Sequence, residues 1–299
     1  GNKMPEPFQL SVAEAAGEIR QGNLSPVELA QSLLARIDAL DPSLKAWVTI
    51  DREEVLSEAK RREDELGQGG PKGPIHGVPV GLKDIYYTAG MLTACGSRIN
   101  ADFVPDYDAT TVSRIKGAGG IILGKAVTTE FAMSDPSPAV NPWNAAHTPG
   151  GSSSGSSVAV AARMCAAALG SQTGGSTCRP AAYNGIVGLK PTYGRISRYG
   201  VVPVSWSLDT VGWMGRTVED MALLLQVMAG PDELDPVASK VSAGDYLSDL
   251  ESAKAPKIGL ITSFFMEESD QETQQMTRSI LDQLKSAGAS VVDVTLPDS

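Results

Sequence analysis

The sequence predicts an α/β fold, in which helices pack around a mainly parallel or mixed β-sheet. From Gly77 onwards, short apolar stretches alternate with helical stretches, and this alternation is typical of layered α/β proteins. The composition agrees, because 42% of the 299 residues are hydrophobic and 31 are glycines, as in a soluble α/β enzyme rather than a disordered or fibrous chain. A chain of this length can bury a large core.

The region before Gly77 is predicted to form three helices. Residues 11–14 (Ser-Val-Ala-Glu) and 25–28 (Ser-Pro-Val-Glu) are capping boxes, the second with proline at the first helical position. A helical stripe of apolar residues follows the second box: Val27, Leu29, Ala30, Leu33, Leu34, Ile37 and Leu40. The third helix, residues 51–66, is highly charged, and its charges are expected to form a solvated face.

The later elements follow from hydrophobic patterning. Strands are expected at residues 78–82, 120–123, 186–189, 257–262 and 290–296. Helices are expected at residues 110–116, 156–168, 218–228 and 271–287. The chain therefore ends on a β-α-β unit that no further helix closes.

Charge and residue counts argue against several classes of function. The net charge of −10 disfavours a nucleic-acid-binding surface, which needs clustered lysine and arginine. No run of 18 apolar residues and no apolar signal core are present, so a cytoplasmic protein is expected. The two histidines, His76 and His147, offer little material for a zinc site or a Ser-His-Asp triad.

Two serines stand out as candidates for nucleophilic chemistry. Ser152 and Ser176 each follow a Gly-Gly pair and lie 176 − 152 = 24 residues apart. A serine nucleophile needs a base, a proton relay and backbone N–H groups close to the reacting carbonyl, and glycine lets the backbone approach closely. A flexible linker is disfavoured, because the small apolar stretch 158–162 demands tight packing. The residues alone do not identify the relay among the serines between 152 and 157.

Lys83 is the candidate base. It follows a strand-like run, Val78 to Leu82, in which apolar residues alternate with proline and glycine, and this context favours burial over the usual surface position of lysine. Burial can lower a lysine pKa from about 10.4 to the range of about 7–8 that a general base needs. The adjacent Asp84 is expected to cap a turn or helix, and Asp135 and Asp209 are expected to be structural residues that hold turns.

Two other motifs are set aside. Residues 119–126 nearly spell a phosphate-binding loop, but Ala126 lacks the hydroxyl that binds Mg²⁺, and Ile-Ile-Leu indicates a buried strand. The three cysteines are odd in number and lack a C-x-x-C pair, which suits reduced thiols. Among them Cys178 is a conceivable nucleophile, but a small buried packing residue is the favoured interpretation.

Residues 150–191, taken with Gly-Leu-Lys-Asp at 81–84, closely match the defining segment of the amidase signature family, and the resemblance runs from about Leu10 to the end. It implies the amidase-signature fold, a central mixed β-sheet covered by helices on both faces, as a single catalytic domain over residues 1–299. Members of the family usually continue well past this point, so a C-terminal part is expected to be missing.

The resemblance also implies a Ser–cis-Ser–Lys triad. Ser176 would be the nucleophile, Ser152 the bridging serine after a cis peptide bond, and Lys83 the base. The oxyanion would be held by backbone N–H groups of Thr173, Gly174, Gly175 and Ser176. No metal or organic cofactor is implied. The expected ligand is a small-molecule amide, without direct nucleic-acid or membrane contact. The options for assembly are a homodimer and a small partner subunit.

Two departures from the family pattern bear on function. Gln172 stands where many members have aspartate, and Arg179 lies three residues after the nucleophile, as in malonamidase-type amidases. Arg179 would bind a substrate carboxylate or hold the loop. The resulting hypothesis is an amidohydrolase that cleaves linear, non-peptide C–N bonds through an acyl-enzyme on Ser176. The alternatives are an amidotransferase A subunit that releases ammonia from glutamine for a tRNA-dependent partner, and an inactive interaction protein of the same fold.

Overall fold

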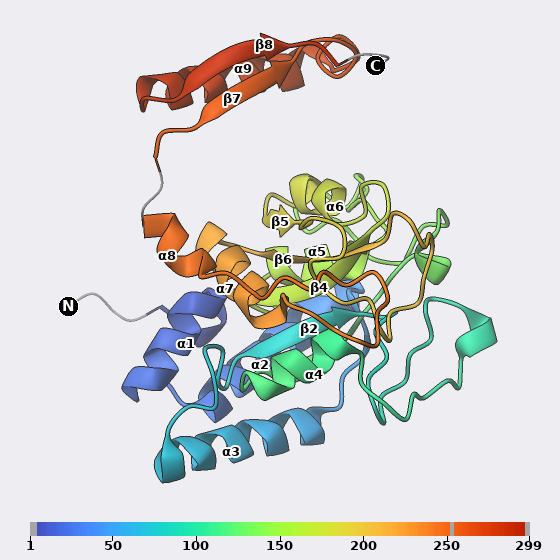
Figure 1. Ribbon diagram of the computed structural model, residues 1–299. Helices are drawn as coiled ribbons and strands as arrows, with labels where there is room; N and C mark the ends of the chain where they lie inside the picture. The colour runs from blue at the N-terminus through green and yellow to red at the C-terminus, as the bar shows by residue number, and fades with distance from the viewer. Residues whose placement is uncertain (1–4, 252–253, 297–299) are drawn as a thin grey trace. The chain divides into compact units, whose positions relative to one another are not determined.

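The computed structural model describes residues 5–251 and 254–296 (Figure 1). The chain divides into two compact units, Gly1–Leu247 and Ser248–Ser299. All the residues predicted to take part in catalysis belong to the first unit. The prediction of one catalytic domain over residues 1–299 stays a prediction, and residues 297–299 at its end lie outside the described residues.

The first unit is built on a six-stranded mixed sheet, in the order β1-β3-β2-β4-β6-β5. The strands are β1 (Trp47–Thr49), β2 (Pro79–Lys83), β3 (Ile121–Ala126), β4 (Ala167–Gln172), β5 (Val187–Leu189) and β6 (Thr210–Gly215). The three central strands β3, β2 and β4 run parallel, whereas β1, β6 and β5 each pair antiparallel with their neighbours. The predicted mixed α/β sheet is confirmed.

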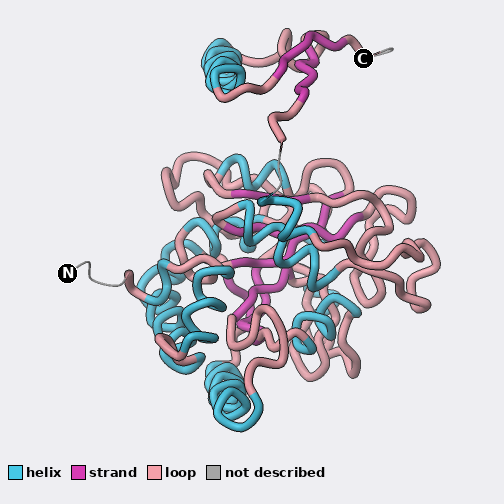
Figure 2. Tube along the Cα trace, turned by 60° about the vertical axis from the view of Figure 1, so that its left-hand side comes forward, coloured by secondary structure: helices cyan, strands magenta, loops and turns pink. Residues whose placement is uncertain are grey.

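Helices cover both faces of this sheet (Figures 1 and 2). They are α1 (Val12–Gln21), α2 (Pro26–Leu44), α3 (Arg52–Gly69), α4 (Thr110–Gly117), α5 (Ser154–Ala161), α6 (Cys178–Tyr183) and α7 (Val218–Met228), with short 3₁₀ turns at Pro7–Gln9, Arg98–Asn100 and Glu130–Ala132. Both predicted capping boxes form at the starts of α1 and α2. No helix among the described residues is long and apolar enough to cross a membrane.

Two hydrophobic cores lie on opposite faces, as the alternation along β3 illustrates. Ile122 packs in a core with apolar side chains of α1, α4 and α7. Its neighbours Ile121 and Leu123 pack in the other core, with α5 and parts of α2 and α3. Residues 119–126 therefore form the buried strand β3 and the two residues before it, which agrees with the rejection of a phosphate-binding loop.

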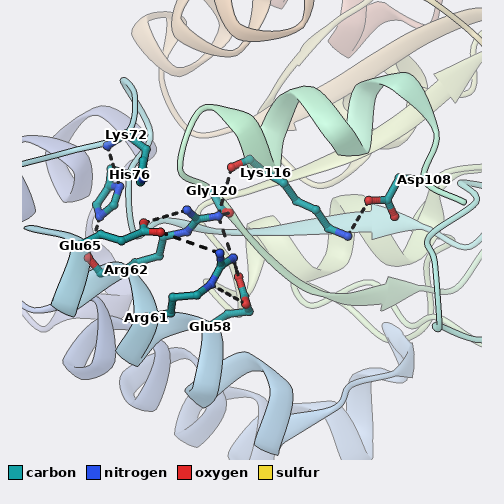
Figure 3. A network of polar contacts seen from close by, with 9 residues as sticks. All are labelled: Glu58, Arg61, Arg62, Glu65, Lys72, His76, Asp108, Lys116 and Gly120. Carbon is teal, nitrogen blue, oxygen red and sulfur yellow. Dashed lines mark hydrogen bonds and ion pairs between the residues drawn. The ribbon is translucent and has the colours of Figure 1, made fainter. Parts of the chain in front are cut away.

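The charged helix α3 is not wholly a solvated face, and that expectation was wrong for Arg62. Its side chain is only 5% exposed and pairs with Glu65 at 2.9 Å. It also donates a hydrogen bond to the Lys116 carbonyl at 3.1 Å, while the His76 imidazole contacts the Arg62 carbonyl at 2.8 Å (Figure 3). Arg62 thus ties α3 to the end of α4, because a buried guanidinium is tolerated only when it is paired.

The second unit contains one parallel β-α-β arrangement, as predicted. β7 (Lys257–Ile261) pairs with β8 (Ser290–Val294), and α9 (Gln271–Ser286) connects them. Asp270 caps α9 by accepting a hydrogen bond from the Thr273 backbone N–H at 2.7 Å. The short helix α8 (Tyr246–Glu251) contains the boundary between the two units.

The main error in the predicted elements is at residues 156–168. The helix α5 ends at Ala161, and Arg163 adopts a left-handed backbone with φ of 59°. The chain then enters β4, which the sequence analysis missed because a short apolar run suits a buried helix and a buried strand equally. Strands β1 and β6 and helices α6 and α8 were also not predicted.

Candidate active site

The candidate site lies where parallel strands end at one edge of the sheet. β2 ends at Lys83, and its parallel neighbour β4 ends at Gln172. Polar side chains at the carboxyl ends of adjacent parallel strands face a common crevice, so Lys83 and Ser171 are brought together although they are 88 residues apart in the sequence.

Lys83 is fully buried and makes two hydrogen bonds. Its Nζ lies 2.7 Å from Ser152 Oγ and 2.9 Å from Ser171 Oγ. Burial lowers the pKa of Lys83 from 10.5 to about 7, and the negative charge of Asp209 acts in the opposite direction. Lys83 can therefore be neutral near pH 7 and accept a proton, which is what a general base requires.

The backbone on both sides of Ser152 is held in place. The Gly151–Ser152 bond is cis, as the family resemblance implied. The Ser152 carbonyl accepts hydrogen bonds from the Thr129 backbone N–H at 3.3 Å and from Thr128 Oγ1 at 3.2 Å. The backbone therefore fixes the hydroxyl that contacts Lys83.

The neighbouring serines have other partners. Ser153 Oγ accepts from the Ser171 N–H at 3.2 Å, Ser156 Oγ donates to the Leu169 carbonyl at 2.8 Å, and Ser157 Oγ donates to the Ser154 carbonyl at 2.9 Å. The first two bonds hold the start of α5 against β4. In the described part of the chain, Ser152 and Ser171 are the serines whose hydroxyls bond Lys83.

Ser176 lies beside Ser152 through a backbone contact. The Ser153 N–H donates to the Ser176 carbonyl at 3.3 Å, and Ser176 is half-buried. No hydrogen bond joins the Ser176 and Ser152 hydroxyls in the described structure. The Lys83–Ser152 pair is thus directly bonded, whereas Ser176 stands next to it without a direct hydroxyl contact.

The turn that carries Ser176 is fixed at both of its ends. Gln172 Oε1 accepts from the backbone N–H groups of Thr177 and Cys178, each at 2.9 Å. Thr173 Oγ1 donates to Asp209 Oδ1 at 2.5 Å. Gln172, where many family members have aspartate, acts here as a neutral acceptor that holds the turn.

The turn leaves backbone donors available. Among the described residues, the N–H groups of Gly174, Gly175 and Ser176 donate to no acceptor within the chain. A Cβ added at Gly174 would meet no atom within 4 Å, so the backbone there is open to a ligand. Free N–H groups beside a serine are the arrangement that stabilises an oxyanion.

Arg179 contacts the backbone of the other Gly-Gly-Ser segment. Its Nη2 and Nε donate to the Gly151 carbonyl at 2.8 and 3.2 Å. Its side chain is exposed and lines a cavity of about 680 Å³ that also includes His147 and Tyr183. Nη1 lies 3.6 Å from where a Cβ on Gly175 would stand. Arg179 therefore bridges both glycine-rich segments, and its Nη1 has no hydrogen-bond acceptor among the described residues.

Asp84, the neighbour of Lys83, is fully buried opposite Lys125, with Asp84 Oδ1 4.0 Å from Lys125 Nζ. Burial raises the pKa of Asp84 to about 6, whereas Lys125 and the N–H groups of residues 94–96 lower it. Among the described residues, neither carboxylate oxygen has a hydrogen-bond partner of good geometry. Lys125 itself donates to Thr93 Oγ1 at 2.7 Å and to the Tyr86 carbonyl. Asp84 thus belongs to a buried ion pair and faces the N–H groups of residues 94–96, so it serves a turn, one of the two expected roles, and not a helix.

Cys178 was expected to be buried and is exposed. It occupies the first position of α6, a helix that buries Pro180 and Ala181, so its own side chain faces solvent. Cys95 and Cys165 are buried, and burial raises the pKa of both thiols, to about 11 and about 12.

The sequence analysis missed two polar contributions. Ser171 lies on the unpredicted strand β4, so its place next to Lys83 could have been found only by recognising that strand. Asp209 has the structural role that was expected, with bonds to Thr173 and to the N–H groups of Val204 and Ser205. Its influence on the Lys83 pKa was not foreseen.

Known proteins resemble this chain over nearly its whole length. The A subunit of glutamyl-tRNA(Gln) amidotransferase from Geobacter metallireducens is 42% identical over 299 residues, which cover 98% of this chain and 61% of that protein. The structure of native peptide amidase from Stenotrophomonas maltophilia is 37% identical with a TM-score of 0.90, over 98% of this chain and 64% of that one.

The structure of a glutamyl-tRNA(Gln) amidotransferase A subunit from Thermotoga maritima is 34% identical with a TM-score of 0.83, over 99% of this chain and 63% of that one. The chain thus spans about three fifths of the length of the curated relatives that it matches. A family model described as amidase matches residues 28–299. The chain belongs to the amidase family, in its amidase-signature group.

Proposed function

We propose that this protein hydrolyses a carboxylic amide by acyl transfer to Ser176 and then to water, and that it acts in the cytoplasm on linear, non-peptide amides. The observation that carries the proposal is the buried Lys83 whose Nζ lies 2.7 Å from Ser152 Oγ, with a pKa lowered to about 7 by burial. A lysine that is neutral at working pH and bonded to a serine supports the role of a base that acts through that serine.

The proposed reaction begins with two proton transfers. Neutral Lys83 takes the proton of Ser152, which takes the proton of Ser176 as Ser176 Oγ attacks the carbonyl carbon. The oxygen that becomes negative is stabilised by the free N–H groups of Gly174, Gly175 and Ser176, with Thr173 proposed as a further donor. Removing one such donor typically costs about 10²–10³ in rate.

Collapse of the tetrahedral intermediate breaks the C–N bond. Ser152, which now carries the proton from Ser176, gives it to the leaving nitrogen, which departs as ammonia or an amine, and Ser152 regains a proton from the Lys83 ammonium. Water then attacks the acyl-enzyme with the same base, and the carboxylic acid leaves while Ser176 regains its proton. Every step uses residues of this chain.

The proposed role of Arg179 is to bind a substrate carboxylate. Two of its nitrogens hold the Gly151 carbonyl, and Nη1 beside Gly175 supports a single charge-assisted hydrogen bond to an anionic substrate group. The bonds to Gly151 equally support the loop-holding role, so the two roles are separated by experiment.

A second candidate function is supported by the relatives. Curated relatives at about 42% identity are named as the A subunit of glutamyl-tRNA(Gln) amidotransferase, so release of ammonia from glutamine for a partner protein is the alternative proposal. Glutaminase activity that appears only with copurified partner proteins would favour it. An inactive protein of the same fold is disfavoured by the preserved Lys83–Ser152 contact.

The test of the nucleophile uses Ser176→Ala, with Cys178→Ala as the matched control. We expect Ser176→Ala to lower kcat/KM for primary amides by at least about a thousandfold with the fold intact. Mass spectrometry should detect an acyl-enzyme adduct in wild type and none in this variant. Cys178→Ala removes an exposed thiol two residues away, and this variant should keep the wild-type kcat/KM and still form the acyl-enzyme adduct. Full turnover in Ser176→Ala would reject the assignment.

A further inference from the structure

We propose that a cavity beside the catalytic turn binds an apolar, aromatic-sized group of the amide substrate. The inference rests on the proposed function and names the substrate class for it. The cavity has a volume of about 390 Å³ and is formed by the loop at residues 198–206, the loop at 234–236 and two tyrosines, Tyr87 and Tyr107. Its size falls within the range of about 300–1,000 Å³ typical of small-molecule sites.

Two polar residues connect the cavity to the reacting centre. Ser171, which lines it, accepts the hydrogen bond from Lys83 Nζ at 2.9 Å. Asp209, which also lines it, accepts the Thr173 hydroxyl at 2.5 Å, and Thr173 begins the turn that carries Ser176. One wall of the cavity therefore contains a residue that bonds the proposed base and a residue that bonds the start of the proposed oxyanion turn.

The rest of the lining is mainly apolar and aromatic. It includes Tyr87, Tyr199, Val202, Val204, Trp206 and Leu234. Three of these reach solvent at the rim, with Trp206 74%, Leu234 60% and Val204 36% exposed. Exposed tryptophan and leucine around a concave site mark a surface that gains from covering by an apolar ligand.

The charged groups in the lining are engaged within the chain. Arg198 donates to the Trp206 carbonyl at 2.9 Å and lies 3.7 Å from Asp235. Asp235 accepts the Arg198 backbone N–H at 2.7 Å. Asp209 accepts the N–H groups of Val204 and Ser205 at 2.7 and 2.9 Å. Since these charges hold the loops, the cavity selects by shape and apolar contact.

The experiment compares acetamide with hydrocinnamide, which adds a phenyl group on a short chain, as substrates of the purified full chain. We expect kcat/KM to favour hydrocinnamide by about 10- to 100-fold, as burial of a ring-sized apolar group gives. Trp206→Ala should reduce this preference by about tenfold. It removes only the indole, since the Trp206 carbonyl still accepts from Tyr193 and Arg198.

Two further variants make the result specific. Val204→Trp fills the cavity and should also reduce the preference, while its backbone N–H to Asp209 stays available. Leu208→Ala is the matched control, because Leu208 is 58% exposed two residues after Trp206 and is not part of the lining. It should leave the ratio of the two kcat/KM values unchanged.

Equal kcat/KM for both amides, unaffected by Trp206→Ala and Val204→Trp, would overturn the apolar site while the amidase proposal stands. If neither these amides nor glutamine is hydrolysed, the amidase proposal fails instead. Calorimetric binding of hydrocinnamide to wild type and to Val204→Trp then still decides the cavity: weaker binding by the variant supports it, and equal or absent binding rejects it.

Discussion

Replacing Lys83 with methionine should make the fold more stable at neutral pH while it removes activity. Lys83 is fully buried, and its pKa falls from 10.5 to about 7. Between these values the unfolded chain binds the lysine proton and the folded chain releases it. Stability therefore rises with pH through this window, and the cost of burying Lys83 is fully present below pH 7.

The magnitude follows from the two pKa values. A pKa difference of about 3.5 corresponds to about 4–5 kcal/mol at pH 7. Methionine removes this cost and keeps most of the volume, but the hydroxyls of Ser152 and Ser171 lose a partner, at about 1 kcal/mol each. The net gain in unfolding free energy for Lys83→Met is then about 2 kcal/mol at pH 7, and it should vanish near pH 9.

The decisive measurement is the difference in unfolding free energy between Lys83→Met and wild type, from urea titrations at pH 7, 8 and 9. The advantage of the variant should shrink by about 2 kcal/mol over this range. Wild type gains stability as the pH rises, because its unfolded chain still holds a lysine proton that its folded chain has released. Lys72→Met, at an exposed position, is the control. Its unfolding free energy should change with pH in the same way as that of wild type. If the difference in unfolding free energy between Lys83→Met and wild type does not change with pH, the claim that Lys83 is buried with a lowered pKa is refuted.

Three other substitutions test the surroundings of the site. Arg179→Ala should raise KM for an acid-bearing amide such as succinamic acid and change neutral amides little; equal losses on both would leave only the loop-holding role. Asp209→Asn should move the acidic limb of the kcat/KM–pH profile to lower pH, because the Asp209 charge raises the Lys83 pKa; an unmoved limb would contradict this. Lys125→Met should destabilise the fold by about 3 kcal/mol, since it leaves buried Asp84 unpaired, and adding Asp84→Asn should recover part of the loss in urea unfolding; no recovery would exclude the ion pair as the cause.

Much of the fold could be predicted from local signals. Capping boxes before α1 and α2 and the apolar stretch of β2 each specify their structure through a few adjacent residues. β4 had no such signal, because Ala167 to Gln172 is small and apolar enough for either state. Only the left-handed turn at Arg163 separates it from α5, and arginine is not a residue type that predicts such a turn.

The sequence predicted which residues make up the candidate site better than it predicted the contacts between them. Gly-Gly-Ser segments and an apolar lysine context pointed to Ser152, Ser176 and Lys83, while the choice among the serines depended on a family resemblance. Contacts that join distant strands, such as Lys83 to Ser171, depend on sheet order and register. Those are properties of the whole chain, which local patterns do not encode.

The small residues around the site have a steric reason that also explains why so many serines gather there. A Cβ on Gly170 would stand 2.7 Å from Ser153 Oγ, and one on Gly155 would stand 2.4 Å from the Ala46 carbonyl. The start of α5 can therefore approach β4 closely because Gly170 has no side chain, and α5 can approach the backbone of Ala46 and Val127 because Gly155 has none. At that distance serine is the side chain that can satisfy the neighbouring backbone groups without enlarging the gap. Ser152 lies just before α5. Close packing of α5 on β4 thus brings Ser152 within hydrogen-bond distance of Lys83 at the end of β2.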